Sequence, residues 1–352
     1  MDRTRINRKS VLSRALVALA LLSLVVSVIA VAGRGDKSGT AAAQELLIPI
    51  GAREIALGGS TMADVAGIDA LYWNPAGLVR SEDQTNVMFS HMSYLADIAV
   101  DYGALSTTIP DIASFGVSVT SLSFGKIPVT TEDYPDGTGE TASPSFVILG
   151  GAVSRLVTDH ISFGFECNVV IENMDKVSAT GVAFTFGLQY RGLGGIDGLS
   201  LGASVNNIGP AMTYDGDGLL RVGQVDDVLR PETQYKIQAA SSDMPSAIII
   251  GLGYTALTTE NETVKFTSIY QNNNYSDDEY RLGAEWTTHK IVSLRLGYSG
   301  SAEGGSGSTV YGLSLGVGVA GRFEGIDLSV DYAYRSAQYF AGNHVLTLGL
   351  GF

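Results

Sequence analysis

Several features that would define common protein classes are missing from this 352-residue chain. The chain has one cysteine, Cys167, so an internal disulfide bond is excluded. After residue 43 no apolar run reaches the roughly 18 residues that a membrane-spanning helix needs. The histidines, His91, His160, His289 and His344, stand singly, and none has a second His or Cys at metal-ligand spacing. The sequence therefore predicts no metal site, no cofactor and no helical membrane domain after residue 43.

The first 43 residues have the order of a secretory signal peptide. A basic stretch over residues 3–14 precedes an apolar run over residues 15–32, and three alanines follow at residues 41–43. This order predicts cleavage after Ala43 and export through the inner membrane. Because the segment is longer than the usual 15–30 residues, a retained helical anchor is the alternative interpretation.

The charge balance of the remaining chain excludes a nucleic-acid partner. After residue 43 it holds 15 basic and 34 acidic residues, a net charge near −19. Such an acidic protein cannot neutralise a phosphate backbone. Yet only 16% of the whole chain is charged, 43 residues are glycine and the mean hydropathy is positive, at +0.19. An exported, apolar chain without a spanning helix is most simply a transmembrane β-barrel.

Strict alternation of apolar and polar residues supports the barrel. In residues 326–335, Ile, Leu, Val, Tyr and Tyr alternate with Asp, Ser, Asp, Ala and Arg, and residues 182–190 and 280–286 show the same pattern. Successive side chains leave opposite faces of a strand, so one face is apolar and the other polar or small. A soluble β-sandwich would also alternate, but strands of about ten to thirteen residues exceed the five or six that are typical of globular sheets.

Counting these segments predicts an antiparallel barrel of about fourteen strands over residues 85–352. The even number returns both chain ends to the periplasm. The connections alternate between short turns and longer segments, of which 126–144 and 208–245 are the predicted extracellular loops. The segment Gln234–Ala239 could form a fifteenth strand, but we assign it to the second loop because an odd count would break the parity.

The last strand carries a predicted assembly signal. Leu346, Leu348, Leu350 and Phe352 share one face, and the sequence ends on the aromatic residue. This pattern resembles the recognition signal of the outer-membrane barrel assembly machinery, which is thus a predicted partner together with outer-membrane lipid.

Residues 45–84 lack the alternation and are interrupted by glycine and proline. The run GAREIALGGSTMADVAGIDALYWNPAGL, which starts at Gly51, resembles the N-terminal signature of the PorV/PorQ family of outer-membrane barrels, which is related to the FadL-type transporters. Further matches lie at 206–210, 281–286 and 330–334, so the resemblance spans the chain from about residue 51 to its end. It implies that residues 44–84 form a plug, or hatch, inside the barrel; an ordinary periplasmic tail is the alternative. The motif residues expected in this plug are Gly51, Arg53, Gly58, Gly59, Tyr72, Trp73, Asn74, Pro75, Ala76 and Gly77.

Alternation also places charged residues on the polar, lumen-facing side of the strands. Ionisable groups at membrane depth must pair or face water. We expect these residues to pair with each other and with the plug through Arg53, Glu54 or Asp64; a substrate path lined by them is the minority interpretation. The predicted lumen charges are Asp101, Glu166, Lys265, Arg281, Glu285, Arg295, Asp327, Asp331 and Arg335.

Two function classes follow, and neither is enzymatic, since no motif supports a Ser–His pair oriented by a third group. The resemblance to PorV/PorQ implies a component of type IX protein secretion and cell-surface attachment in a Gram-negative-type outer membrane. Its implied partners are a secretion gate and cargo with C-terminal sorting domains, and this is the favoured interpretation. The alternative is a FadL-like channel for hydrophobic small molecules. A channel predicts an apolar pocket between plug and wall; a docking barrel predicts a filled lumen and exposed apolar residues on the loops.

Overall fold

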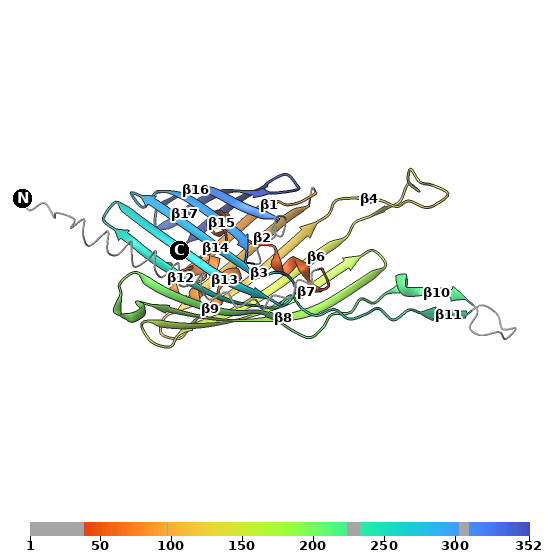
Figure 1. Cartoon of the computed structure of the whole chain (residues 1–352), viewed down its shortest axis with the longest axis horizontal. Coiled ribbons are helices and arrows are strands. Elements are labelled where there is room, and N and C mark those ends of the chain that lie inside the picture. Colours follow the sequence, from red (N-terminus) through yellow and green to blue (C-terminus); the bar gives the residue numbers. More distant parts are fainter. Residues whose placement is uncertain (1–38, 97, 224–232, 303–309) are drawn as a thin grey trace, which may run out of the picture.

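The structure, a computed structural model, describes residues 39–352 except 97, 224–232 and 303–309. Within these residues, fourteen antiparallel strands close into a transmembrane β-barrel, which confirms the predicted fold (Figure 1). Most of the predicted signal peptide, residues 1–38, lies outside the described part of the chain. Its removal therefore stays a prediction.

Each barrel strand pairs with its neighbours in the chain, and the last strand pairs with the first. The barrel strands are β1 (Thr85–Ser93), β2 (Ala99–Ile109), β3 (Ala113–Ser123), β6 (Ser145–Leu156), β7 (Ile161–Met174), β8 (Val177–Arg191), β9 (Leu199–Ile208), β12 (Ala247–Thr258), β13 (Glu262–Asn273), β14 (Glu279–Thr288), β15 (Val292–Ser301), β16 (Tyr311–Phe323), β17 (Ile326–Ala337) and β18 (Asn343–Gly351). Closure is completed by β1 and β18, where His91 lies opposite Leu346. The closed ring leaves no unpaired sheet edge in the barrel wall.

The two ends of the barrel differ. The loop end carries the long connections 124–144 and 209–246, and the turn end carries both terminal strand ends and turns such as 110–112. Each long connection contains a two-stranded hairpin, β4 (Ile127–Pro128) with β5 (Thr141–Ala142), and β10 (Leu220–Gly223) with β11 (Thr233–Lys236). Both hairpins project beyond the barrel (Figure 1). The segment considered as a fifteenth strand therefore contributes β11, which lies outside the barrel.

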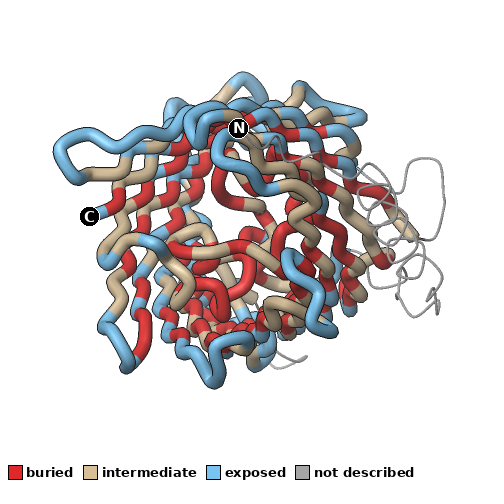
Figure 2. Tube along the Cα trace, turned by 90° about the vertical axis from the view of Figure 1, so that its left-hand side faces the viewer, coloured by how far each residue is buried: buried red, intermediate tan, exposed pale blue. Residues whose placement is uncertain are grey.

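Buried and exposed residues alternate along the strands (Figure 2), because successive side chains point in turn to the lumen and to the outer surface. On β15, Leu294 and Leu296 are exposed while Arg295 is buried. Exposed aromatic residues lie near both rims, with Tyr298, Tyr332 and Tyr334 toward the loop end and Trp286, Phe323 and Phe352 toward the turn end. Such girdles mark the two membrane interfaces of an outer-membrane barrel.

Residues 44–80, called the plug below, lie inside the ring of strands. The plug consists of short helices: η2 (Gln44–Leu47), α2 (Ala52–Ala56), η3 (Gly67–Asp69), α3 (Ala70–Trp73) and η4 (Pro75–Arg80). None of the helices in the described part of the chain has the length and apolar character needed to span a bilayer. Positive φ angles at Gly58 and Gly59, 68° and 71°, turn the chain sharply after α2. Apolar plug residues such as Ile55, Leu71 and Leu78 pack in the main buried cluster of the molecule.

Candidate functional site

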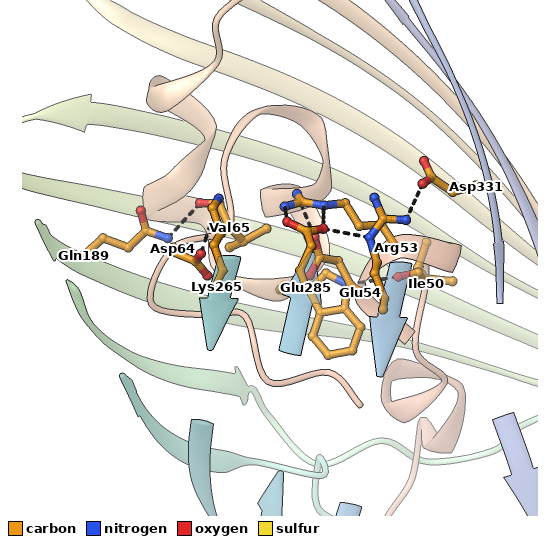
Figure 3. Close-up of polar contacts among 11 residues, drawn as sticks. Ile50, Arg53, Glu54, Asp64, Val65, Gln189, Lys265, Glu285 and Asp331 are labelled. Carbon is orange, nitrogen blue, oxygen red and sulfur yellow. Dashed lines mark hydrogen bonds and ion pairs between the residues drawn. The ribbon is translucent and has the colours of Figure 1, made fainter. Parts of the chain in front are cut away.

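An ion network joins the plug to one side of the barrel wall. The guanidinium of Arg53 donates from Nε and Nη2 to the two carboxylate oxygens of Glu285, each at 3.2 Å. Arg295 donates from Nε to the same carboxylate at 2.7 Å, and its Nη1 lies 2.5 Å from Asp331 Oδ1. Figure 3 shows Arg53 beside Glu285, with Glu54 nearby. A second bridge joins plug Asp64 to Lys265 over 3.7 Å. Buried carboxylates are stable when paired in this way.

The Asn-Pro-Ala element anchors the plug by neutral hydrogen bonds. The buried side chain of Asn74 donates to the carbonyl oxygen of Met62 at 2.8 Å and accepts from the Ala76 amide at 3.2 Å. From the wall, Gln189 donates to the carbonyl oxygen of Val65 at 2.9 Å (Figure 3). These contacts hold the turns of the plug to one another and to β8.

Glycines on the inner face of the wall receive the plug backbone. A Cβ atom added at Gly164 would overlap the backbone of Pro75 and Ala76, and one added at Gly297 would overlap the backbone of α2 and Gly58. Gly187 takes the Asn74 side chain in the same way. These glycine contacts were not among the sequence predictions. The signal that could have indicated these contacts is the repeated occurrence of glycine at lumen-facing positions in strands whose residues alternate between apolar and polar.

Most of the predicted lumen charges face the lumen. Glu285, Arg295 and Asp331 form the network above, and Lys265 pairs with the plug. Asp327 lies at the turn end, 3.7 Å from Arg322. The others that face the lumen are Glu166, Arg281 and Arg335, which line the cavity described below.

The prediction for Asp101 was wrong. Asp101 points outward, with 62% of its side chain exposed, and contacts His91 Nδ1 at 2.7 Å on the outer surface. The error lay in which face of β2 was assigned to the lumen. The apolar residues Val100 and Tyr102 face inward, so Asp101 between them faces outward. The pair lies at the level of outward-facing Tyr332, since Leu346 is opposite both His91 and Tyr332. At the level of an aromatic girdle, polar side chains such as these lie near lipid head groups rather than hydrocarbon.

A cavity of about 630 Å³ lies between the plug and the wall. Its apolar lining includes Leu46, Ile48 and Trp73 of the plug and, from the wall, Leu122, Phe146, Ile148, Ile249 and Ile269. Its polar lining includes Glu45, Glu166, Asn168, Tyr275, Arg281, Tyr311 and Arg335. Arg335 stacks on the ring of Tyr311, 3.4 Å from its centre, and its Nη1 has no hydrogen-bond partner among the described residues. The lumen is therefore only partly filled.

Burial raises the pKa of two carboxyl groups of the plug. Burial and the neighbouring Glu172 raise the pKa of Glu45 to about 8. Burial raises the pKa of Glu54 to about 7, although Arg53 opposes the shift. Both groups therefore favour the protonated form when the plug is docked.

We expect the docked plug to weaken as the pH rises. A carboxyl group with a raised pKa stabilises the docked state fully below about pH 4.5, and this contribution is lost as the pH passes about 7 to 8. The melting temperature of the purified protein should thus fall between pH 5 and pH 9. Glu45→Gln, which is neutral at every pH, should reduce the fall, and an identical pH profile in this variant would contradict the prediction.

No protein family model matches the sequence, and no curated protein matches it. Solved structures do match. The toluene transporter TodX of Pseudomonas putida has a TM-score of 0.55 and 12% identity, over 86% of this chain and 96% of TodX. The toluene transporter TbuX of Ralstonia pickettii gives 0.55 and 12%, over 86% and 98%. A FadL homologue of Pseudomonas aeruginosa gives 0.50 and 12%, over 86% and 97%. At this identity the matches show that the chain has the fold of these barrels.

Proposed function

We propose that this protein is an outer-membrane channel that admits hydrophobic small molecules through its plugged lumen. The observation that supports this most is the cavity of about 630 Å³ between the plug and the wall. Its size lies within the roughly 300–1,000 Å³ of small-molecule sites, and apolar side chains supply much of its lining. A channel predicts such a pocket, whereas a barrel that only docks other proteins predicts a filled lumen.

The plug would act as the gate of this channel. In the proposed orientation the loop end faces the exterior and the turn end faces the periplasm. At the turn end, Arg80 donates to the carbonyl oxygen of His160 at 2.8 Å and to Ser162 Oγ at 3.0 Å, which ties the end of the plug to the wall. Passage from the cavity toward the periplasm therefore requires part of the plug to move. The neighbours TodX and TbuX are described as toluene transporters, which agrees with this proposal.

The secretion role implied by the PorV/PorQ resemblance is the second candidate. The projecting hairpins favour it, because they expose Ile127, Val222 and Tyr235 to solvent. Exposed apolar residues on loops suit protein docking. No family match supports the PorV/PorQ assignment, so the secretion gate and the cargo domains stay predicted partners.

One purification experiment distinguishes the channel function from the secretion function. The protein is extracted from its own outer membrane in mild detergent, and bound small molecules and proteins are identified by mass spectrometry. We expect an apolar molecule on the wild type and its loss from Ile249→Trp, which fills the cavity. Ile248→Trp is the matched control, because Ile248 points outward on the same strand. A co-purified large barrel, or exported proteins sharing a C-terminal domain, without bound small molecules would favour secretion instead.

A further inference from the structure

A polar niche is set into the cavity wall on the side of β2, β3, β6 and β7. Glu166 and Asn168 on β7, Ser118 on β3 and Tyr102 on β2 all line the cavity there. At the centre of the niche, Gly150 of β6 carries no side chain. A Cβ at this position would lie 2.8 Å from Asn168 Oδ1 and 3.5 Å from Glu166 Oε1 and would overlap Ser118 Oγ. The glycine thus gives the polar side chains of Ser118, Asn168 and Glu166 room to pack close together at the cavity wall.

Glu166 is a buried carboxyl group without a cation beside it. Only 5% of the residue is exposed, and no ion pair of Glu166 occurs among the described residues. Its hydrogen-bond partner is the side chain of Asn168. Glu285, by contrast, has two guanidinium groups. The cavity's own cations do not compensate Glu166, since Arg281 and Arg335 lie on β14 and β17, on the other side of the barrel.

Burying a carboxyl group whose partner is a single neutral amide is costly, and the cost falls when a further hydrogen-bond donor or a cation reaches it. The niche is open toward the cavity, so a molecule in the cavity can supply that donor. Around the niche the lining is apolar, with Leu122 and Phe146 on the wall and Ile48 on the plug. A ligand that suits both the apolar lining and the buried carboxyl group has an apolar body and one head group that donates hydrogen bonds.

We propose that the cavity selects amphipathic molecules whose head group donates hydrogen bonds, an amine or a hydroxyl, and that Glu166 accepts that group. This inference rests on the proposed channel function and specifies its substrate class. It separates such ligands from hydrocarbons and ethers of the same size, which bring no further donor to the carboxyl group. Sites built to hydrogen-bond a ligand group reject analogues that lack it.

The test titrates detergent-solubilised protein with four twelve-carbon probes and counts bound molecules by native mass spectrometry. Dodecylamine and dodecan-1-ol carry donors, 1-methoxydodecane carries an acceptor only, and dodecanoate carries a negative charge. We expect the amine or the alcohol to bind at least about tenfold more tightly than the ether. The stronger of the two identifies whether the natural head group is an amine or a hydroxyl.

Variants assign the preference to the niche. Glu166→Gln keeps the shape of the side chain and should weaken the amine about tenfold, while Glu166→Leu should abolish the preference of both donor probes over the ether. Asp101→Asn is the matched control, since it removes an outward-facing carboxylate next to Tyr102 and should change nothing. Three results would each overturn the inference without contradicting the channel proposal. The ether could bind as tightly as the donor probes, dodecanoate could bind most tightly of all, or both Glu166 variants could keep the wild-type preference. The channel proposal itself would be contradicted if no probe binds and if Ile249→Trp, purified from the native membrane, carries the same bound molecules as the wild type.

Discussion

Replacing Glu285 with leucine is expected to release the plug and to open the barrel. Glu285 is the only wall carboxylate among the described residues that contacts Arg53, and it also holds Arg295. Removing it takes one of two carboxylate partners from each guanidinium group, so that Arg53 keeps only its contact with Glu54, inside the plug, and Arg295 keeps only Asp331, in the wall. Breaking a buried ion pair from one side costs about 3–5 kcal/mol. In planar lipid bilayers, Glu285→Leu should therefore show large open-channel currents where the wild type stays closed.

Two further variants make this result specific. Arg53→Met should have a smaller effect, because Glu285 keeps its 2.7 Å contact with Arg295. Glu262→Leu removes a carboxylate that bonds to Trp286 and Thr288 near the turn end and does not contact the plug. Its currents should match those of the wild type. Closed Glu285→Leu channels, or equal opening by Glu262→Leu, would show that the ion network does not hold the plug.

The second large effect is expected from valine at Gly164. A side chain there would occupy the position of the Pro75 and Ala76 backbone, and backbone cannot move aside as a flexible side chain can. Overpacking a well-packed interior costs about 1–3 kcal/mol even where neighbours relax. Because rigid plug backbone fills this socket, we expect the plug to be displaced and to become sensitive to added protease, while the barrel still forms.

Gly151→Val provides the matched control. Gly151 lies on neighbouring β6 and points outward, and no atom of the described residues, its two chain neighbours apart, lies within 4 Å of an added Cβ. Both changes place the same β-branched residue in the same part of the wall, and valine suits a strand. Protease should cut the plug of Gly164→Val only. Equal resistance of the two variants would show that the plug can shift away from β7 without leaving the lumen.

The barrel could be predicted from the sequence because period-two alternation is a local property that is visible in most of the strands. The start of β17 at Ile326, for example, is already visible in the alternation of residues 326–335. The plug was expected from its lack of alternation and from the resemblance. Which plug residue meets which wall residue could not be predicted, because the pairing of Arg53 with Glu285 joins positions 232 residues apart.

Two other features, the direction of Asp101 and the cavity, depend on three-dimensional packing and not on the sequence pattern. Whether Asp101 points into or out of the lumen depends on which residues of β2 face inward. Because apolar residues lie on both faces of that strand, the sequence pattern does not show this. The cavity is what remains after the plug folds, so its volume and its lining follow from three-dimensional packing alone. The alternation rule placed Glu166 in the lumen, but the absence of a cation beside it emerged only from the structure.

The buried start of the plug constrains the timing of biogenesis. Ala43 is only 2% exposed, and the amide of neighbouring Ala42 donates to the carbonyl oxygen of Asp243 at 2.9 Å in the second long connection. A peptidase needs an extended, accessible chain, and the folded barrel offers none at this position. If the chain is cut after Ala43, as predicted, the cut precedes closure of the barrel. The mature N-terminus is then carried into the lumen while the strands assemble around it.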